Sequence, residues 1–166
     1  MSDHQPSRAE VLATLTAPGQ PFELIDSTVF GRACRFFKNA PATLRDLYYD
    51  NASDLEFLVY EDERLTYAEA YSKSAQIAQL LIRQYGITPG DRVAISMRNY
   101  PEWVLSFMAV TSIGGIAVAM NSLWRPDEMA YGLLDSGAKV LLADEKRLAR
   151  FAQIENTPGQ TLDVPT

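Results

Sequence analysis

Apolar residues recur at three- and four-residue steps most clearly over residues 66–85, and this period predicts an amphipathic helix. The side expected to face the core carries apolar residues at seven positions: Tyr67, Tyr71, Ala75, Ala78, Leu81, Ile82 and Tyr85. Thr66 and Glu69 have the spacing of a capping box, and Gly86 is placed to end the helix. The pattern therefore predicts both the helix and its two ends.

Weaker patterns precede this helix. Residues 8–15 and 43–52 each predict a short helix, the first with few apolar residues to anchor it. Residues 56–60 and 64–66 flank an acidic turn, which predicts a small hairpin with a solvated tip. Residues 22–39 show no clear period and predict no regular element.

After residue 92 the pattern changes to short apolar runs that alternate with helical segments. Buried strands are predicted over residues 93–97, 116–120 and 140–143. A buried helix over residues 101–113 joins the first two strands, and a helix that begins at Pro126 and is stopped by Gly137 joins the second and third. Residues 145–154 predict a further helix. This β-α-β-α-β order is typical of an α/β fold, an open and mostly parallel sheet with helices on its faces.

These patterns divide the chain into three parts. Residues 1–41 form an N-terminal extension, and residues 42–155 form the α/β part with its preceding helical segment and hairpin. Residues 156–166 show no period and are interpreted as a truncated tail. No internal repeat and no low-complexity tract is present in the sequence.

Composition narrows the function classes. The 166 residues are 47% hydrophobic with a net charge of −6, which favours a globular protein and argues against nucleic-acid partners. No apolar run is long enough to span a membrane and no signal peptide is evident, so we expect a cytoplasmic protein. The single cysteine, Cys34, is interpreted as a small buried residue. His4 is the single histidine, so no catalytic triad and no His-rich metal site is predicted.

Phosphate-binding motifs do not stand out. The loop after the first strand, residues 98–101, contains no glycine, and the sequence has no Walker A motif. Residues 111–115 resemble a phosphate loop superficially, but they end a helix and enter a strand, so we interpret them as a turn.

Charged residues after the third strand are the stronger candidates. Asp144 lies where open α/β sheets bind ligands, either as a helix N-cap or, less favoured, as a phosphoacceptor of receiver type. Lys146, Arg147 and Arg150 follow and can meet an anion, or they can form a solvated helix face. Trp124 and the next arginine lie in the loop after the second strand, where ligand binding and packing explain them equally well.

Several short motifs, in one fixed order, resemble the amino-terminal region of AMP-forming acyl-CoA synthetases, members of the adenylate-forming superfamily. The long-chain fatty-acid–CoA ligases are the most similar in style, and related benzoate, coumarate and peptide-synthetase adenylation enzymes are the alternatives. The stretches that carry the resemblance are residues 65–69, 86–95, 99–103, 114–121, 128–131 and 135–141.

The resemblance implies that the sequence is part of a larger domain. Enzymes of this family activate a carboxylate, such as a fatty acid, with ATP and magnesium to an acyl-adenylate, and then transfer the acyl group to coenzyme A. The family's phosphate loop, magnesium site and catalytic lysine lie beyond Thr166, so no catalytic and no metal-binding residue is expected in this chain. Basic residues after the third strand approach the 3′-phosphate of coenzyme A in some members, which implicates Arg147 and Arg150.

The resulting hypothesis is an amino-terminal fragment that is inactive alone and carries no cofactor of its own. Its partner is the remainder of the parent chain, and self-association through exposed apolar surface is a second expectation. The alternative hypothesis is a stand-alone α/β binding or interaction module without ligase activity.

Overall fold

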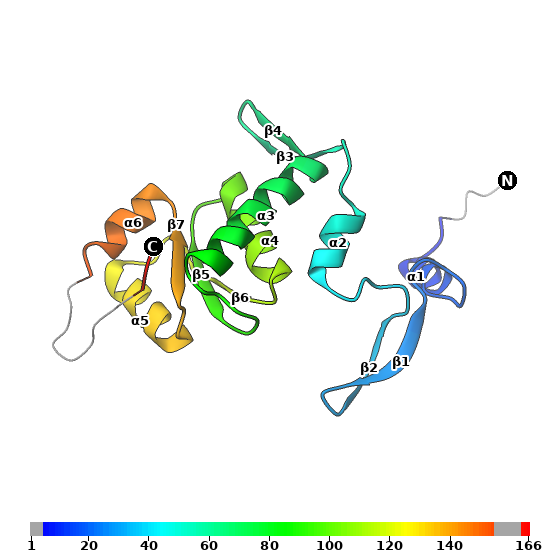
Figure 1. The fold of residues 1–166 in the computed structure, drawn as a ribbon. Helices are drawn as coiled ribbons and strands as arrows, with labels where there is room; N and C mark the ends of the chain where they lie inside the picture. Colours follow the sequence, from blue (N-terminus) through cyan, green and yellow to red (C-terminus); the bar gives the residue numbers. More distant parts are fainter. Residues whose placement is uncertain (1–4, 155–163) are drawn as a thin grey trace. The chain divides into compact units, whose positions relative to one another are not determined.

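The computed structural model describes residues 5–154 and 164–166 (Figure 1). The described residues divide into two compact units, one ending at Ala42 and the other beginning at Thr43.

The N-terminal unit consists of helix α1 (Arg8–Leu15) and a two-stranded antiparallel hairpin of β1 (Leu24–Val29) and β2 (Arg32–Phe37). Ser7 and Glu10 form a capping box at the start of α1. No residue of α1 is buried, which confirms the prediction of a weakly anchored helix.

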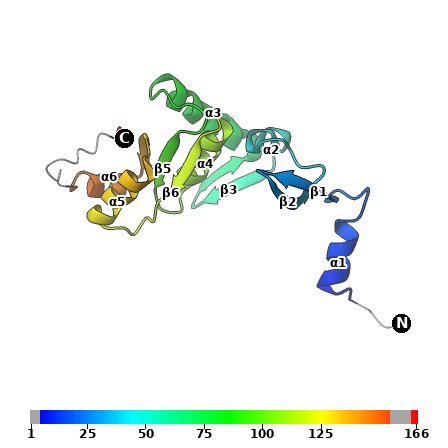
Figure 2. The same cartoon turned by 90° about the horizontal axis from the view of Figure 1, so that it is seen from below.

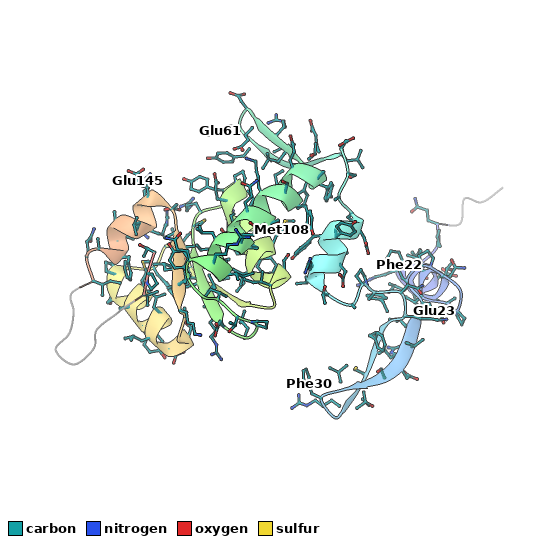
Figure 3. The ribbon with its side chains drawn as sticks, in the orientation of Figure 1. Phe22, Glu23, Phe30, Glu61, Met108 and Glu145 are labelled. Atoms are coloured by element: carbon teal, nitrogen blue, oxygen red, sulfur yellow. The ribbon has the colours of Figure 1, made fainter. Side chains whose placement is uncertain are left out.

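The prediction of no regular element over residues 22–39 is wrong, because these residues contain the hairpin of β1 and β2. Its tip is Phe30-Gly31, and both residues have positive φ, 48° and 75°. Phe30 is fully exposed at the end of the hairpin (Figure 3). Neither face of the hairpin is covered enough to impose alternating apolar and polar residues, so the sequence lacks the usual strand signal. Cys34 in β2 is half-buried rather than buried.

The described residues of the second unit form ten elements in the order that the sequence predicts. They are α2 (Leu44–Asp50), β3 (Glu56–Tyr60), β4 (Glu63–Thr66), α3 (Tyr67–Arg83), β5 (Arg92–Ser96), α4 (Pro101–Ser112), β6 (Ile116–Ala119), α5 (Pro126–Ser136), β7 (Val140–Ala143) and α6 (Glu145–Phe151). Strands β3 and β4 form the predicted hairpin, whose acidic tip is exposed. The α/β fold with a small preceding hairpin is confirmed.

Strands β5, β6 and β7 form a parallel sheet in the order β6-β5-β7. The chain leaves the central strand β5 for one edge of the sheet and then returns to the other edge. Right-handed crossovers in opposite directions place α4 and α5 on opposite faces, as Figures 1 and 2 show. The backbone N–H of Leu141 donates to the carbonyl of Pro165 at 3.0 Å, so residues 164–166 lie along β7.

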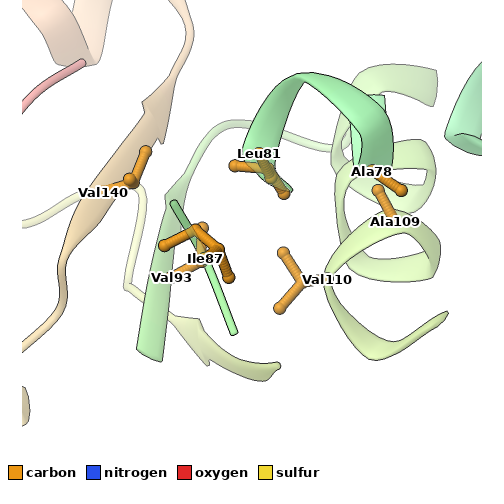
Figure 4. Packing of buried hydrophobic residues seen from close by; sticks show 7 residues of the cluster. All are labelled: Ala78, Leu81, Ile87, Val93, Ala109, Val110 and Val140. Atoms are coloured by element: carbon orange, nitrogen blue, oxygen red, sulfur yellow. The ribbon is translucent and has the colours of Figure 1, made fainter. Parts of the chain in front are cut away.

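One core layer lies between the sheet and helices α3 and α4 (Figure 4). The buried positions of α3 are Ala70, Ser74, Ala78 and Leu81. The predicted apolar face is therefore partly wrong, because Ile82 is 48% exposed while the small residues are buried. Small side chains let α4 pack closely against α3, with Ala78 and Ala109 in the same cluster.

A second core layer on the other face is built around Met129, Leu133 and Leu141. Trp124 is packed against this layer, and a Cβ atom at Gly132 would lie only 2.6 Å from its indole ring. Gly132 is therefore needed for close approach of the loop after β6 to helix α5.

Candidate functional site

The reversal of strand order creates a crevice at the carboxyl ends of β5 and β7, the usual place for ligands in open α/β sheets. A cavity of about 510 Å³ lies there, within the 300–1,000 Å³ typical of ligand pockets. We call it the basic cavity; its lining residues are Tyr60, Arg98, Asn99, Tyr100, Lys146, Arg147 and Arg150. Four of the seven are cations, so the cavity is suited to an anion.

Asp144 connects the two loops that form the crevice. Its Oδ2 accepts a hydrogen bond from the backbone N–H of Arg98 at 2.9 Å, across the gap between β5 and β7. Its Oδ1 accepts from the backbone N–H of Arg147 at 3.0 Å, which makes Asp144 the N-cap of α6. The structure thus confirms the N-cap interpretation of Asp144.

The environment of Asp144 favours its ionised form. Partial burial by itself raises the pKa of this carboxyl, but hydrogen bonds from the backbone amides of Arg98 and Arg147 and from the Arg147 guanidinium outweigh it. The resulting pKa lies below the ordinary value for aspartate. Asp144 therefore remains an anion that holds the Arg147 guanidinium and the backbone amide of Arg98.

Arg147 is the least accessible cation of the cavity, with its side chain only 4% exposed. One terminal nitrogen lies 3.3 Å from Asp144 Oδ2, and Nε donates to the carbonyl of Ser122 at 2.8 Å. Because Ser122 follows β6, the Asp144–Arg147 pair joins the loops after all three parallel strands. Arg147 thus adds positive charge to the lining of the cavity, and its contacts with Asp144 and Ser122 connect the loops that form the cavity.

The remaining cations are more accessible. Arg150 is half-buried, and one terminal nitrogen donates to the carbonyls of Ser122 and Trp124 at 2.9 and 3.1 Å. Arg98 and Lys146 are exposed at the rim. Sequence reasoning missed Arg98, because only the strand order brings the loop after β5 beside α6.

An aromatic pair forms the opposite side of the cavity. The rings of Tyr60 and Tyr100 lie 5.5 Å apart in a T-shaped arrangement. Burial raises the pKa of Tyr60, and the nearby Glu61, Tyr100 and Glu102 raise it further. Tyr60 thus stays protonated as a hydrogen-bond donor. Sequence reasoning assigned Tyr60 to the hairpin and gave it no role at a site.

The other sequence candidates lie outside this cavity. Residues 111–115 form the expected turn, in which Gly114 has a φ of 75°. Arg125 is paired with Asp127 at 3.0 Å. His4 lies outside the described residues, and so does most of the segment 156–166.

The described part of the chain lacks two features that would point to other functions. Within residues 5–154 and 164–166, no cluster of three His, Cys, Asp or Glu residues is arranged to hold a metal ion. None of the helices over the same residues combines the length and apolar character that a membrane span requires.

The fold and the anion-suited crevice are those of an α/β domain, and comparison with known proteins identifies its family. The family described as AMP-binding enzyme matches residues 48–165, most of the second unit. The chain therefore belongs to this family of adenylate-forming enzymes and acyl-CoA ligases, as the motif resemblance predicts.

Individual relatives agree with this assignment. The chain is 34% identical over 127 residues to a medium/long-chain-fatty-acid–CoA ligase, FadD6, of Mycobacterium tuberculosis; the match covers 74% of this chain and 21% of the relative. It is 33% identical over 103 residues to 4-hydroxybutyrate–CoA ligase 2 of Metallosphaera sedula, covering 62% of this chain and 19% of the relative. The chain spans about a fifth of the length of these relatives.

Solved structures show the same fold. A fatty acyl-CoA synthetase of Mycobacterium tuberculosis matches 74% of this chain and 26% of its own, with a TM-score of 0.66 and 27% identity. The anthranilate CoA ligase AuaEII, solved with anthranoyl-AMP, matches 68% of this chain and 22% of its own, with a TM-score of 0.64 and 27% identity. In these enzymes the matched fold is part of a larger domain.

Proposed function

We propose that the chain is the amino-terminal part of an ATP-dependent, AMP-forming acyl-CoA synthetase whose carboxylate substrate is a fatty acid. Family membership and the names of the similar CoA ligases support the reaction class. The fatty-acid assignment is supported by the similarity to two mycobacterial proteins with fatty acyl names. Because the single cysteine forms no internal disulfide, the cytoplasm is the proposed compartment.

Within this function, the basic cavity is assigned to the phosphate groups of coenzyme A. The observation that carries the assignment is the convergence of four cations at the strand-order reversal, in a chain of this family. Arg150, Arg98 and Lys146 are accessible enough to donate to phosphate oxygens, while Arg147 contributes charge from beneath. Arg147 and Arg150 are the two residues that the sequence resemblance implicates.

The chain alone is proposed to be inactive, because the family's ATP and magnesium residues are expected outside these 166 residues. The remainder of the parent enzyme is then its partner, and apolar side chains exposed on the chain favour self-association in its absence. Release of pyrophosphate by the complete gene product, with fatty acid, ATP and coenzyme A, tests the enzyme assignment. Absence of that activity would favour the stand-alone binding module.

Calorimetric titration of the chain with 3′,5′-ADP, the phosphate-bearing end of coenzyme A, tests the cavity. Saturable binding is expected, and Arg98→Gln and Arg150→Gln are each expected to weaken it about tenfold. Arg92→Gln is the matched control, because Arg92 is an exposed arginine at the start of β5, whereas Arg98 follows the other end of that strand. Titration with MgATP is expected to give no saturable heat, and saturable MgATP binding would contradict the expectation that the family's ATP-binding residues lie outside this chain.

A further inference from the structure

The tip of the β1–β2 hairpin carries a residue that its own unit does not explain. Val29 pairs with Arg32, so Phe30 and Gly31 form a two-residue loop in which both residues have positive φ. Such a loop favours Asn-Gly, because a bulky side chain is strained in the left-handed region. Phe30 is nevertheless 100% exposed and projects from the end of the hairpin (Figure 3). Neither turn formation nor packing among the described residues accounts for a phenylalanine here.

Apolar surface continues from the tip along one face of the hairpin. Residues that pair across the two strands lie on the same face, and alternate residues of a strand share that face. Four residues of this face are apolar: Ile25, Val29, Cys34 and Phe36. Val29 and Phe36 are 48% and 40% exposed, so the described residues leave much of the face open.

Cations lie on the strand that leads away from the tip. Arg32 follows the tip directly, and Arg35 is three residues further, about 10 Å along β2. Both are exposed, and neither forms an ion pair with a carboxylate among the described residues. Residues 22–39 contain three cations and two carboxylates, whereas the whole chain has a net charge of −6. The hairpin is therefore positive in a negative chain.

An apolar tip followed by free arginines fits the surface of an anionic lipid bilayer. An inserted aromatic ring lies at the boundary of the acyl chains, while arginine side chains extend to the phosphates. The headgroup layer is roughly 5–8 Å thick, so Arg32 reaches it when the adjacent tip is inserted. The hairpin also precedes residues 48–165, which match the family, so it lies outside the region that the family shares. This position favours a partner other than the shared catalytic domain.

We propose that the β1–β2 hairpin binds the protein reversibly to an anionic membrane surface. Val29 and Phe30 insert among the lipids, and Arg32 and Arg35 contact the headgroup phosphates. This inference goes beyond the proposed function, because the lipid surface is neither a substrate nor a cofactor of the ligase reaction. A single short hairpin buries little apolar surface, so the binding is weak and depends on the arginines.

Sedimentation of the chain with lipid vesicles measures the binding directly. The chain is expected to bind phosphatidylcholine vesicles with about 30 mol% phosphatidylglycerol at least tenfold tighter than pure phosphatidylcholine vesicles, because each arginine gains from the anionic surface. The difference is expected to disappear largely at about 0.5 M NaCl, because salt screens exposed charges.

Matched variants test the apolar and the charged part of the surface separately. Phe30→Asn is expected to weaken binding about tenfold without disturbing the fold, because asparagine suits the loop. Leu55→Asn, at a 71% exposed position of the second unit, is the control and is expected to change nothing. Arg32→Gln is expected to weaken binding to anionic vesicles about fivefold and to leave binding to phosphatidylcholine unchanged. Arg83→Gln, at an exposed position of α3, is its control.

Fluorescence quenching tests whether the tip enters the bilayer. The two tryptophans of the chain, Trp103 and Trp124, lie in the second unit. Phe30→Trp adds a reporter at the tip and is expected to retain binding. Lipids with brominated acyl chains are expected to quench this added emission, while the emission of the unsubstituted chain changes little.

Several results would overturn the inference. They are equal binding to both kinds of vesicle, unchanged binding of Phe30→Asn, and no quenching of Phe30→Trp. A dimer in analytical ultracentrifugation that Phe30→Asn abolishes, without vesicle binding, would assign the tip to a second copy of the chain. Vesicle binding by this chain but not by the complete gene product would assign the hairpin to the remainder of the parent enzyme. Because the assay contains no ATP, fatty acid or coenzyme A, its outcome is independent of the proposed function.

Discussion

Helices α1 and α3 begin with the same capping chemistry but differ in what holds them. In α1, Ser7 Oγ accepts from the Glu10 amide at 3.3 Å; in α3, Thr66 Oγ1 accepts from the Glu69 amide at 3.1 Å. Helix α1 buries no residue, whereas α3 buries four. Capping thus decides where a helix begins, while tertiary burial supplies most of its stability.

The two units differ in the same way. Among the described residues of the N-terminal unit, the buried position is a charged one, Glu23. The backbone N–H of Gly19 donates to Glu23 at 2.8 Å, and Lys38 Nζ lies 3.0 Å from it; these two contacts, in that order, lower the pKa of Glu23. The second unit instead contains apolar clusters on both faces of its sheet. The first unit is organised by polar contacts and the second by a core.

Leucine truncation in the two units tests this difference most strongly. Leu81→Ala removes a fully buried side chain of α3 and is expected to lower the free energy of unfolding by about 3 kcal/mol. Leu12→Ala, at a 49% exposed position of α1, is expected to change it by less than about 0.5 kcal/mol. Urea unfolding followed by far-UV circular dichroism measures both, because helices of both units contribute to that signal. Equal effects would contradict the comparison.

The Asp144–Arg147 pair extends the test to polar contacts inside the second unit. Arg147→Met is expected to lower the free energy of unfolding by about 2 kcal/mol. Breaking a buried ion pair whose remaining partner has no other contact costs more, but two backbone amides still donate to Asp144 here. Arg150→Met, at a half-buried position, is expected to cost less than half as much. Urea unfolding of both variants checks the order. A larger cost for Arg150→Met would show that Arg147 does not hold the three loops together.

Removal of each helix cap tests the contribution of tertiary context. Thr66→Ala is expected to destabilise the second unit by about 1 kcal/mol, and Thr66→Ser to recover most of that loss. Ser7→Ala is expected to leave the fluorescence-detected transition unchanged while increasing amide exchange within α1. A shift of that transition in Ser7→Ala would mean that the two units unfold together.

The smallest effect concerns pH. Lys139 Nζ lies 2.6 Å from Asp91, and this contact, followed by hydrogen bonds from Thr88, lowers the pKa of Asp91 to about 2. A depressed folded-state pKa stabilises the protein above the unfolded value of about 3.9, and this stability is lost as pH falls towards about 2. Lys139→Met is expected to make the free energy of unfolding less dependent on pH between about 4 and about 2. It is also expected to raise the pKa of Asp91 measured by NMR. An unchanged titration would exclude the contact as the cause.

Much of the fold was predictable because local patterns in the second unit agree with its tertiary structure. Apolar runs and caps placed β5, α4, β6, α5 and β7 in the correct order. The hairpin of β1 and β2 was missed because its exposed faces impose no alternation of residue type. The face of α3 was partly wrong because close packing against α4 favours small side chains there over Ile82.

Part of the candidate site was also predictable from the sequence, and part was not. The cluster of Lys146, Arg147 and Arg150 was visible as a basic stretch after an apolar run. Their different positions were not visible, because only the fold buries Arg147 and leaves Lys146 exposed. Arg98 and Tyr60 join them through strand order and hairpin placement, which no local pattern encodes.

The sequence by itself determined the family, the alternation of strands and helices, and the N-caps Thr66 and Asp144. These features depend on residues a few positions apart, where hydrogen bonding and hydrophobic periodicity act directly. Tertiary structure decided which loops share the crevice and how far each cation is buried. Those outcomes depend on contacts between residues distant along the chain, such as Arg98 with Asp144 and Arg147 with Ser122. These residues become neighbours only because β5 lies at the centre of the parallel sheet, between β6 and β7.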